Sequence, residues 1–309
     1  MGTALVTGAS YGIGADIARA LAARGHDLIL VARGAESLDR LAADLAAVRG
    51  VRARTLPADL TDGADLERVA SAAYGADILV NNAGAGLGRS FERTRWADEQ
   101  RMLDLNVVAP ARLIHAALPA MLRRGDGRIL NVSSVAAAGP VWQGTSYGAA
   151  KAFGLALTES LAYTRLLRAS PVALTALVLG HTTSQFHERA GIPPSPPLLT
   201  LASPYVAERA VRAIHRRRPP VTCVPSLRYK LLAGLLRHTP RRLLALPGLA
   251  DDFTTAGPGA DRPAAADTEA GAAQPVGART GPGEGRSVGA DGEYGVLPAE
   301  TRGHGERQP

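Results

Sequence analysis

The 309-residue chain is poor in cysteine and lacks the usual signals of secretion and membrane insertion. Its one cysteine, Cys223, excludes an internal disulfide and a zinc site of the Cys-x-x-Cys kind, and it fits a reducing compartment. No basic segment followed by an apolar one opens the chain, and no run of about 18 apolar residues occurs. We therefore expect a cytoplasmic protein without a metal site, with the inner face of a membrane as a second location.

Aromatic residues are also few, at 4%, whereas 46% of the residues are hydrophobic, enough for one large α/β domain or two small ones. Negative charge is missing from 209–250, which holds ten Lys and Arg. The end of the chain, 251–309, has the opposite balance, with ten acidic and five basic residues. Positive charge is therefore concentrated in one short region.

Short apolar runs alternate with stretches of helical period over most of the chain. The expected strands are 4–8, 27–32, 51–58, 76–84, 127–134, 172–180 and 220–225, and the expected helices are 13–24, 35–49, 62–74, 97–123, 145–169 and 204–217. Strict alternation indicates a parallel sheet covered on both faces. We predict an α/β fold, a doubly wound, seven-stranded parallel sheet of the Rossmann type, within a single domain over 1–225.

Two further parts follow this domain. Residues 226–250 are predicted to form a basic, amphipathic helical extension. The basic region 212–250 either packs on its own domain or on a subunit partner in a homo-oligomer, or it lies on anionic lipid. Nucleic acid is not an expected partner, because the segment has one aromatic and no reading motif. Residues 251–309, rich in Gly, Pro and Ala, are predicted to be disordered, with partner binding as the functional alternative.

The stretch LVTGASYGIG, residues 5–14, leads from a predicted strand into a predicted helix. Its glycines let the backbone turn sharply and approach a ligand, and the helix N-terminus offers N–H groups to a pyrophosphate. A plain glycine turn is the alternative, but the strand-to-helix position favours nucleotide binding. The candidate cofactor-binding residues here are Gly8, Ser10, Tyr11, Gly12, Ile13 and Gly14.

The end of the second predicted strand indicates which cofactor is used. An acidic residue there would accept the ribose 2′-hydroxyl of NAD, whereas an arginine can hold a 2′-phosphate. This strand ends in Arg33, with no acid before Glu36. We predict NADP(H), with Ser10 as support, and a solvated Arg33 is the alternative.

A phenol and an ammonium lie four residues apart in YGAAK, residues 147–151. On a helix, Tyr147 and Lys151 share one face, roughly 5–6 Å apart at Cβ. Acid–base work near neutral pH requires the pKa of the tyrosine to fall by about 3, which is about 4 kcal/mol. An ammonium at ~4.5 Å supplies about 3.7 kcal/mol at an effective dielectric of ~20, although burial acts in the opposite direction. We expect Lys151 to lower the pKa of Tyr147.

Tyr-x-x-x-Lys alone is common on helix surfaces, but it is the last of six motifs in a fixed order. These are TGASYGIG (7–14), DLT (59–61), NNAG (81–84), Asn106 in LDLNVVAP, NVSS (131–134) and YGAAK (147–151). Over residues 3 to about 190 the chain thereby resembles the short-chain dehydrogenase/reductase family in its compact single-domain form. The resemblance implies an NADP(H)-dependent oxidoreductase, a ketoreductase or alcohol dehydrogenase, that moves a hydride between nicotinamide and a carbonyl carbon.

The resemblance also implies roles by matching position. Tyr147 exchanges a proton with the substrate oxygen, and Lys151 acidifies it and binds the nicotinamide ribose. Ser134 holds the carbonyl oxygen, and Asn106 keeps a water in the proton relay. Ser133 is the competing assignment for Ser134, ranked lower because consecutive strand residues point opposite ways. The remaining cofactor contacts implied are Asp59 and Leu60 at the adenine, and Asn81, Ala83 and Gly84 beside the cofactor.

The chain departs from the family pattern after the sixth predicted strand. Leu179 stands where the family usually has proline, which leaves open how rigidly the following loop is set. Gly180 still turns over the nicotinamide, and Thr182 or Ser184 still bonds its carboxamide. The proline-rich stretch after this loop is typical of a flap over the substrate, but no motif names the substrate. The alternative function is a catalytically idle NADP-binding sensor or scaffold, against which the intact catalytic set speaks.

Overall fold

The computed structural model describes residues 2–139, 142–143, 145–183, 200–244 and 251–252, all of them within one compact unit, Met1–Ala266. Three predicted features therefore lie outside the described residues. They are Ser184, residues 190–199 of the proline-rich stretch, and residues 253–309 of the predicted disordered tail.

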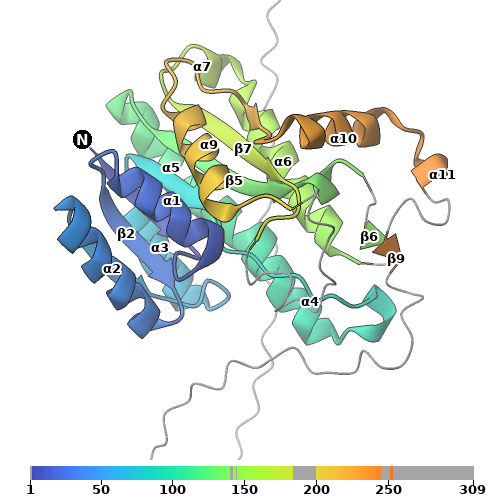
Figure 1. Ribbon diagram of the computed structural model, residues 1–309, viewed down its shortest axis with the longest axis horizontal. Coiled ribbons are helices and arrows are strands. Elements are labelled where there is room, and N and C mark those ends of the chain that lie inside the picture. The colour runs from blue at the N-terminus through green and yellow to red at the C-terminus, as the bar shows by residue number, and fades with distance from the viewer. Residues whose placement is uncertain (1, 140–141, 144, 184–199, 245–250, 253–309) are drawn as a thin grey trace, which may run out of the picture. The chain divides into compact units, whose positions relative to one another are not determined.

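A seven-stranded parallel sheet forms the centre of the described fold, in the order β3-β2-β1-β4-β5-β7-β8 (Figure 1). The strands are β1 (Thr3–Thr7), β2 (Asp27–Ala32), β3 (Ala53–Pro57), β4 (Ile78–Asn81), β5 (Arg128–Ser134), β7 (Ala173–Leu179) and β8 (Thr222–Cys223). The chain winds outward from β1 to β3 and then returns to place β4 on the other side of β1. The carboxyl ends of β1 and β4 therefore flank the crevice where doubly wound sheets bind ligands. The predicted fold class is confirmed.

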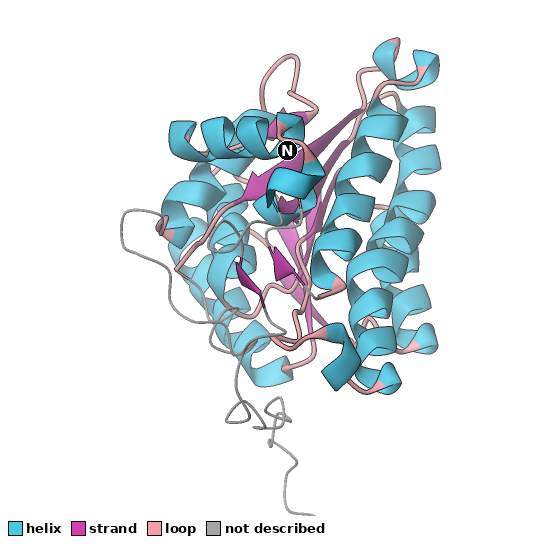
Figure 2. Cartoon of the chain, turned by 90° about the vertical axis from the view of Figure 1, so that its right-hand side faces the viewer, coloured by secondary structure: helices cyan, strands magenta, loops and turns pink. Residues whose placement is uncertain are grey.

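Helices cover both faces of this sheet (Figure 2). One layer contains α1 (Gly12–Ala22), α2 (Ala35–Arg49) and α9 (Ser203–Ile214), and the other contains α3 (Gly63–Tyr74), α5 (Ala109–Arg124), α6 (Tyr147–Ala162) and α7 (Arg165–Arg168). Val6 packs in the first layer and Leu5 in the second, because successive strand residues point to opposite faces. Burial on both faces explains why the strands read as continuous apolar runs.

The helix predicted over 97–123 is interrupted at Asn106. α4 (Trp96–Leu103) and α5 are joined by η2 (Asp104–Val108), a turn with π-helical hydrogen bonding. Pro110 has no N–H to donate to the carbonyl four residues earlier, that of Asn106, which accounts for the wider turn. Within the described residues, Trp96–Arg124 is the one helix long and apolar enough to cross a membrane. Its buried residues, such as Leu113 and Met121, belong to the core, so here it packs on the sheet.

The predicted extension contains α10 (Leu227–His238) and α11 (Arg241–Leu244). α10 packs on the domain through Tyr229 and Leu236, each 4% exposed. Asp251–Asp252 form β9, which pairs in parallel with β6 (Trp142–Gln143). The boundary at 251 between the extension and the tail stays a prediction.

Candidate active site

The turn between β1 and α1 depends on its glycines. Gly8 and Gly12 have φ of +64° and +59°, in the left-handed region that residues with side chains rarely adopt. A Cβ at Gly14 would lie 2.1 Å from the Gly8 carbonyl oxygen, so only glycine allows a turn this tight. Asn82, just after β4, donates from Nδ2 to the carbonyl oxygens of Thr7 and Gly8 at 3.0 and 3.1 Å. The glycine turn is therefore fixed to the neighbouring strand across the crevice.

The first turn of α1, next to this loop, carries no negative charge that would repel a phosphate group. It contains no acidic residue, and the side chain of its N-cap residue, Tyr11, makes no capping hydrogen bond. Tyr11 is exposed, Ser10 is half-buried, and Ile13 packs against the core. Backbone N–H groups in this arrangement bind phosphate groups well. The turn therefore fits the pyrophosphate of a dinucleotide.

The residues predicted to bind the adenine half of the cofactor follow the neighbouring strands β2 and β3. Arg33 is exposed directly after β2. Asp59, after β3, accepts hydrogen bonds from the backbone N–H and the hydroxyl of Thr61 at 3.0 and 2.8 Å. Burial opposes its ionisation, but these bonds and the charges of Arg101 and Arg33 hold the pKa of Asp59 below its ordinary value. The side chain of Leu60 is buried in the core, which leaves its backbone for the predicted adenine contact.

The segment after β4 leads from the glycine turn to the Tyr–Lys helix. The backbone N–H of Ala83 donates to the Thr7 hydroxyl at 3.0 Å. A Cβ at Gly84 would lie 2.8 Å from Asn106 Oδ1 and 3.0 Å from Lys151 Nζ. The backbone at Gly84 therefore passes close to the ends of two side chains predicted to be catalytic, Asn106 and Lys151.

Helix α6 begins at Tyr147 and places Lys151 one turn later on the same face. The two residues are 7% and 8% exposed, and Lys151 Nζ lies 5.7 Å from the centroid of the Tyr147 ring. Ser134, the last residue of β5, is hydrogen-bonded to the Tyr147 phenol through its hydroxyl. Ser133 instead donates to the Lys151 carbonyl oxygen at 3.0 Å. The structure thus brings Ser134 to the phenol and uses Ser133 to hold α6 against β5.

Burial controls the pKa of both residues. It raises the pKa of the Tyr147 phenol above its ordinary 10.0, and the hydrogen bond with Ser134 acts in the other direction. It lowers the pKa of Lys151 from 10.5 to about 8. The predicted lowering of the Tyr147 pKa is therefore wrong for the protein by itself, because the loss of water around a phenolate outweighs the hydrogen bond with Ser134. At neutral pH the phenol is protonated and the Lys151 amine is mostly charged.

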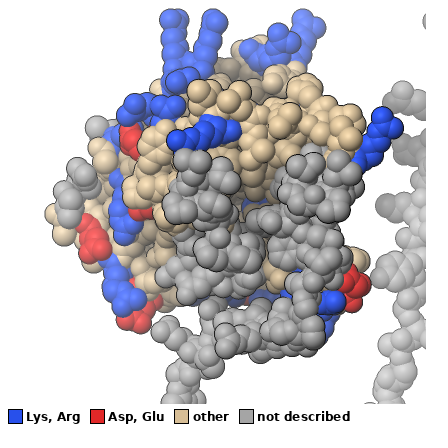
Figure 3. Space-filling view, turned by 45° about the vertical axis from the view of Figure 1, so that its right-hand side comes forward, with Lys and Arg blue, Asp and Glu red and all other residues tan. Residues whose placement is uncertain are grey.

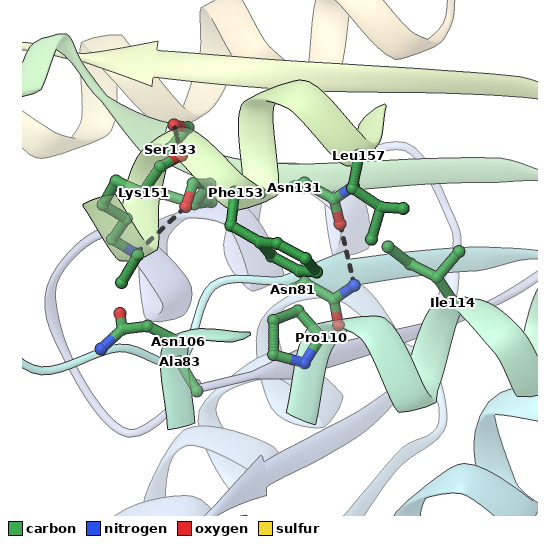
Figure 4. Close-up of a pocket in the computed structure, with 13 residues that line it drawn as sticks. Asn81, Ala83, Asn106, Pro110, Ile114, Asn131, Ser133, Lys151, Phe153 and Leu157 are labelled. Carbon is green, nitrogen blue, oxygen red and sulfur yellow. Dashed lines mark hydrogen bonds between the residues drawn. The ribbon is translucent and has the colours of Figure 1, made fainter. Parts of the chain in front are cut away.

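A small cavity lies behind Lys151, lined from η2, α5, α6 and the ends of β4 and β5 (Figure 4). Its volume open to the centre of a water molecule is about 20 Å³, enough for one or two waters. Asn106 lines it and donates from Nδ2 to the carbonyl oxygens of Ala85 and Met102, at 2.8 and 2.9 Å. Asn106 Oδ1 is buried and has no hydrogen-bond partner among the described residues. An amide oxygen in this state suits a bound water.

Polar groups continue from the cavity into the fold. Asn81 donates from Nδ2 to Asn131 Oδ1 at 2.8 Å (Figure 4). Asn131 in turn donates from Nδ2 to the Thr158 hydroxyl at 2.8 Å. These bonds tie α6 to β4 and β5. The side chain of Asn81 is buried and bonded to Asn131, and its predicted contact with the cofactor stays a prediction. Sequence reasoning gave Asn131 and Thr158 no role, although Asn131 is the first residue of the NVSS motif.

Comparison with known proteins decides the family. Residues 2–191 match the family model of short chain dehydrogenases. The chain belongs to this family. Over 155 residues it is 36% identical to a fatty acyl-CoA reductase from Acinetobacter baylyi, a match that covers 48% of this chain and 52% of that protein. The chain thus spans about half the length of this curated relative.

Solved structures resemble this short chain dehydrogenase over more of its length. A short-chain dehydrogenase from Sphingobium yanoikuyae in complex with NADPH is 36% identical, with a TM-score of 0.68. That match covers 76% of this chain and 93% of the other. A bulky-bulky ketone specific alcohol dehydrogenase from Comamonas testosteroni is 30% identical, with a TM-score of 0.62 over 78% of this chain and 96% of the other.

This short chain dehydrogenase has a buried carboxylate beside its Tyr–Lys helix that sequence reasoning missed. Glu99, in α4, accepts hydrogen bonds from the hydroxyls of Thr94, at 2.7 Å, and of Ser146, which directly precedes Tyr147. It therefore ties the start of α6 to the loop before α4. Its spacing could have indicated that Glu99 is buried. Glu99 lies three residues before Met102 and seven before Asn106, so it shares their helix face.

The loop after β7 has a second feature that the sequence did not reveal. Thr182 is buried, and its hydroxyl donates to the Gly180 carbonyl oxygen at 3.2 Å. Tyr229, from α10, packs on Gly180, and its hydroxyl accepts a hydrogen bond from the backbone N–H of His181 at 2.8 Å. The predicted nicotinamide loop of this short chain dehydrogenase therefore rests on the C-terminal extension.

Proposed function

We propose that this short chain dehydrogenase is an NADP(H)-dependent oxidoreductase that interconverts a carbonyl compound and a secondary alcohol. The observation that carries the proposal is the cluster of Ser134, Tyr147, Lys151 and Asn106 beside the glycine-lined crevice. The hydrogen-bonded hydroxyls of Ser134 and Tyr147 can both approach one substrate oxygen. The glycine turn and the segment after β4 would hold the nucleotide, whose nicotinamide supplies or accepts the hydride.

Tyr147 acts as the general acid in the direction of reduction. Its raised pKa keeps the phenol protonated at neutral pH, the state required to give a proton to the alkoxide that forms. Ser134 orients the carbonyl oxygen by a hydrogen bond. Lys151 binds the nicotinamide ribose, and its positive charge favours the phenolate left behind.

Lys151 and Asn106 return the proton through bound water. Asn106 Oδ1 and the Lys151 ammonium lie 2.8 and 3.0 Å from the position that a Cβ at Gly84 would fill, and both residues line the cavity that accommodates water. A water accepting a hydrogen bond from Lys151 and donating one to Asn106 Oδ1 satisfies both groups. This assigns the four catalytic roles to Asn106, Ser134, Tyr147 and Lys151.

NADP(H) is the proposed cofactor in preference to NAD(H). Arg33 follows β2 at the carboxyl edge of the sheet, where a 2′-phosphate would lie. The next acid along the chain, Glu36, is paired with Arg40 at 3.0 Å and lies on a helix surface. The NADPH complex of the Sphingobium yanoikuyae relative supports the same choice.

A substrate screen followed by NADPH absorbance tests the proposal. It should include ketones, aldehydes and long-chain acyl thioesters, the last because one relative is named a fatty acyl-CoA reductase. We expect NADPH oxidation with at least one carbonyl class, and loss of that activity in Tyr147→Phe. NADPH binding without turnover of any compound would favour the alternative, an idle NADP-binding sensor or scaffold.

We further propose that the catalytic domain, 1–225, uses the extension, 226–250, to contact anionic lipid. On α10, Leu227, Leu231 and Leu235 are 71%, 68% and 65% exposed and recur at helical spacing. Exposed Arg228 and Lys230 flank this stripe. Figure 3 shows Lys and Arg side chains around uncharged surface in the upper part of one face. An apolar stripe with basic flanks is typical of helices at lipid interfaces.

Flotation with vesicles of neutral and of anionic phospholipid tests this contact. We expect flotation with anionic vesicles only, and its loss in Leu231→Glu. Leu166→Glu is the matched control, because Leu166 is 64% exposed but lies on α7. Equal behaviour of both variants, or no flotation of the wild type, contradicts the proposal. If the wild type is a dimer and Leu231→Glu is a monomer, the stripe instead contacts a second copy of the chain.

A further inference from the structure

One side chain of α10 reaches the loop that follows β7. Tyr229 is buried on the inward side of α10, and its hydroxyl accepts the 2.8 Å hydrogen bond from the His181 N–H. Its ring lies against the α-carbon of Gly180, because a Cβ there would be 1.8 Å from the ring Cζ and 2.0 Å from Cε1. A single tyrosine therefore contacts two consecutive residues of the loop.

The same loop is also hydrogen-bonded to the segment that precedes α9. The Leu201 N–H donates to the His181 carbonyl oxygen, and the Thr183 N–H donates to the Leu201 carbonyl oxygen, both at 2.9 Å. These bonds pair the outer edge of the loop in the manner of a short parallel bridge. Thr182 therefore lies in a segment clamped between Leu201 and the ring of Tyr229.

This clamp restricts the peptide units that follow the position of the missing proline. Proline at Leu179 would fix one backbone angle from within the chain. An aromatic ring packed on Gly180 and a hydrogen bond to the next N–H instead restrict the loop from outside. Truncating the ring would leave space beside Gly180 and free the His181 N–H.

We propose that Tyr229 is a positioning residue that holds Gly180 to Thr182 in the conformation that receives the nicotinamide. The inference rests on the proposed function and deepens it. It also makes α10 part of the catalytic unit, although α10 lies beyond the family match at 2–191. A residue outside the family match would then influence cofactor binding.

Binding of two probes to the full-length protein tests the role of Tyr229. NADPH contains the nicotinamide, whereas adenosine 2′,5′-bisphosphate contains only the adenine half and does not reach the loop. Tyr229→Phe, which keeps the ring and loses one hydrogen bond, should weaken NADPH binding about 3- to 10-fold. Tyr229→Ala should weaken it by more than about tenfold, and neither variant should change binding of the bisphosphate by more than about twofold. Tyr74→Phe is the control. It also loses one hydrogen bond to a tyrosine hydroxyl, the one donated by Arg123, and neither residue belongs to α10 or to the loop after β7.

A double-mutant cycle adds a readout that general destabilisation would not produce. Gly180→Ala should weaken NADPH binding when Tyr229 is present, and its effect should shrink in the Tyr229→Ala background, where the Cβ has space. Unchanged NADPH binding in Tyr229→Ala, equal weakening of both probes, or additive effects would overturn the inference. A wild-type protein that binds neither probe would overturn the proposed function, and the inference with it.

Discussion

Replacing Lys151 by methionine should stabilise this protein while removing its activity. Folding lowers the pKa of Lys151 from 10.5 to about 8, so at about 1.4 kcal/mol per pH unit the buried ammonium costs roughly 3 kcal/mol at neutral pH. Losing its 3.3 Å hydrogen bond to the Val132 carbonyl oxygen offsets about 1 kcal/mol of that gain. Methionine keeps an unbranched apolar side chain. We expect the free energy of unfolding to rise by about 2 kcal/mol, or Tm by about 4–8 °C.

The pH dependence of the stability difference separates the cost of burying the Lys151 charge from other effects of the substitution. Between pH 8 and 10.5 the unfolded chain binds more protons than the folded one, so the cost is complete below about pH 8 and disappears toward 10.5. Denaturant unfolding of wild type and Lys151→Met, at neutral pH and near the upper end of this range, measures it. The control Lys230→Met, at an exposed position on α10, should change stability by less than about 0.5 kcal/mol. A Lys151→Met variant less stable than wild type, or a difference independent of pH, would refute the reasoning.

Three further predictions follow from single contacts. Ser134→Ala should lower kcat by about 100-fold. Ser133→Ala should instead mainly lower the free energy of unfolding, by about 0.5–1.5 kcal/mol, because one buried hydrogen bond to the Lys151 carbonyl oxygen is lost; the reverse pattern would exchange their roles. Glu99→Ala should lower the free energy of unfolding by about 2–3 kcal/mol because two hydroxyls lose a buried carboxylate. Its neighbour Asp98→Ala, which breaks an exposed ion pair, should cost less than about 1 kcal/mol, and equal costs would contradict the role of Glu99. Arg33→Ala should weaken NADP binding about 10- to 100-fold in calorimetric titration and leave NAD binding unchanged, so equal losses for both nucleotides would rule out a 2′-phosphate contact.

The sheet and the glycine turn could be predicted from the sequence because their signals are local. Continuous apolar runs mark strands buried on both faces, and the turn between β1 and α1 requires glycine for steric reasons at Gly8 and Gly14. The opposite directions of Ser133 and Ser134 could also be predicted, because side chains alternate along a strand, and the two hydroxyls have different partners in the structure.

The remaining features depend on packing between distant segments. The pKa of Tyr147 was predicted with the wrong sign because its burial depends on tertiary contacts, whereas Lys151 is a local neighbour. Ser146 meets Glu99 across 47 residues, and Tyr229 meets His181 across 48. Asn81 sits in a motif suited to the cofactor, and its side chain is bonded to Asn131. No spacing rule reaches contacts of this range.

The hydroxyl of Tyr147 is the group on which the proposed proton transfer depends. Single-turnover reduction of a substrate by NADPH, compared between wild type and Tyr147→Phe at saturating nucleotide, tests it directly. We predict a rate lower by about 10²–10⁴-fold with an NADPH Kd close to that of wild type, because the lost group meets the substrate oxygen. A variant that turns over at nearly the wild-type rate would contradict the role of Tyr147 as the acid.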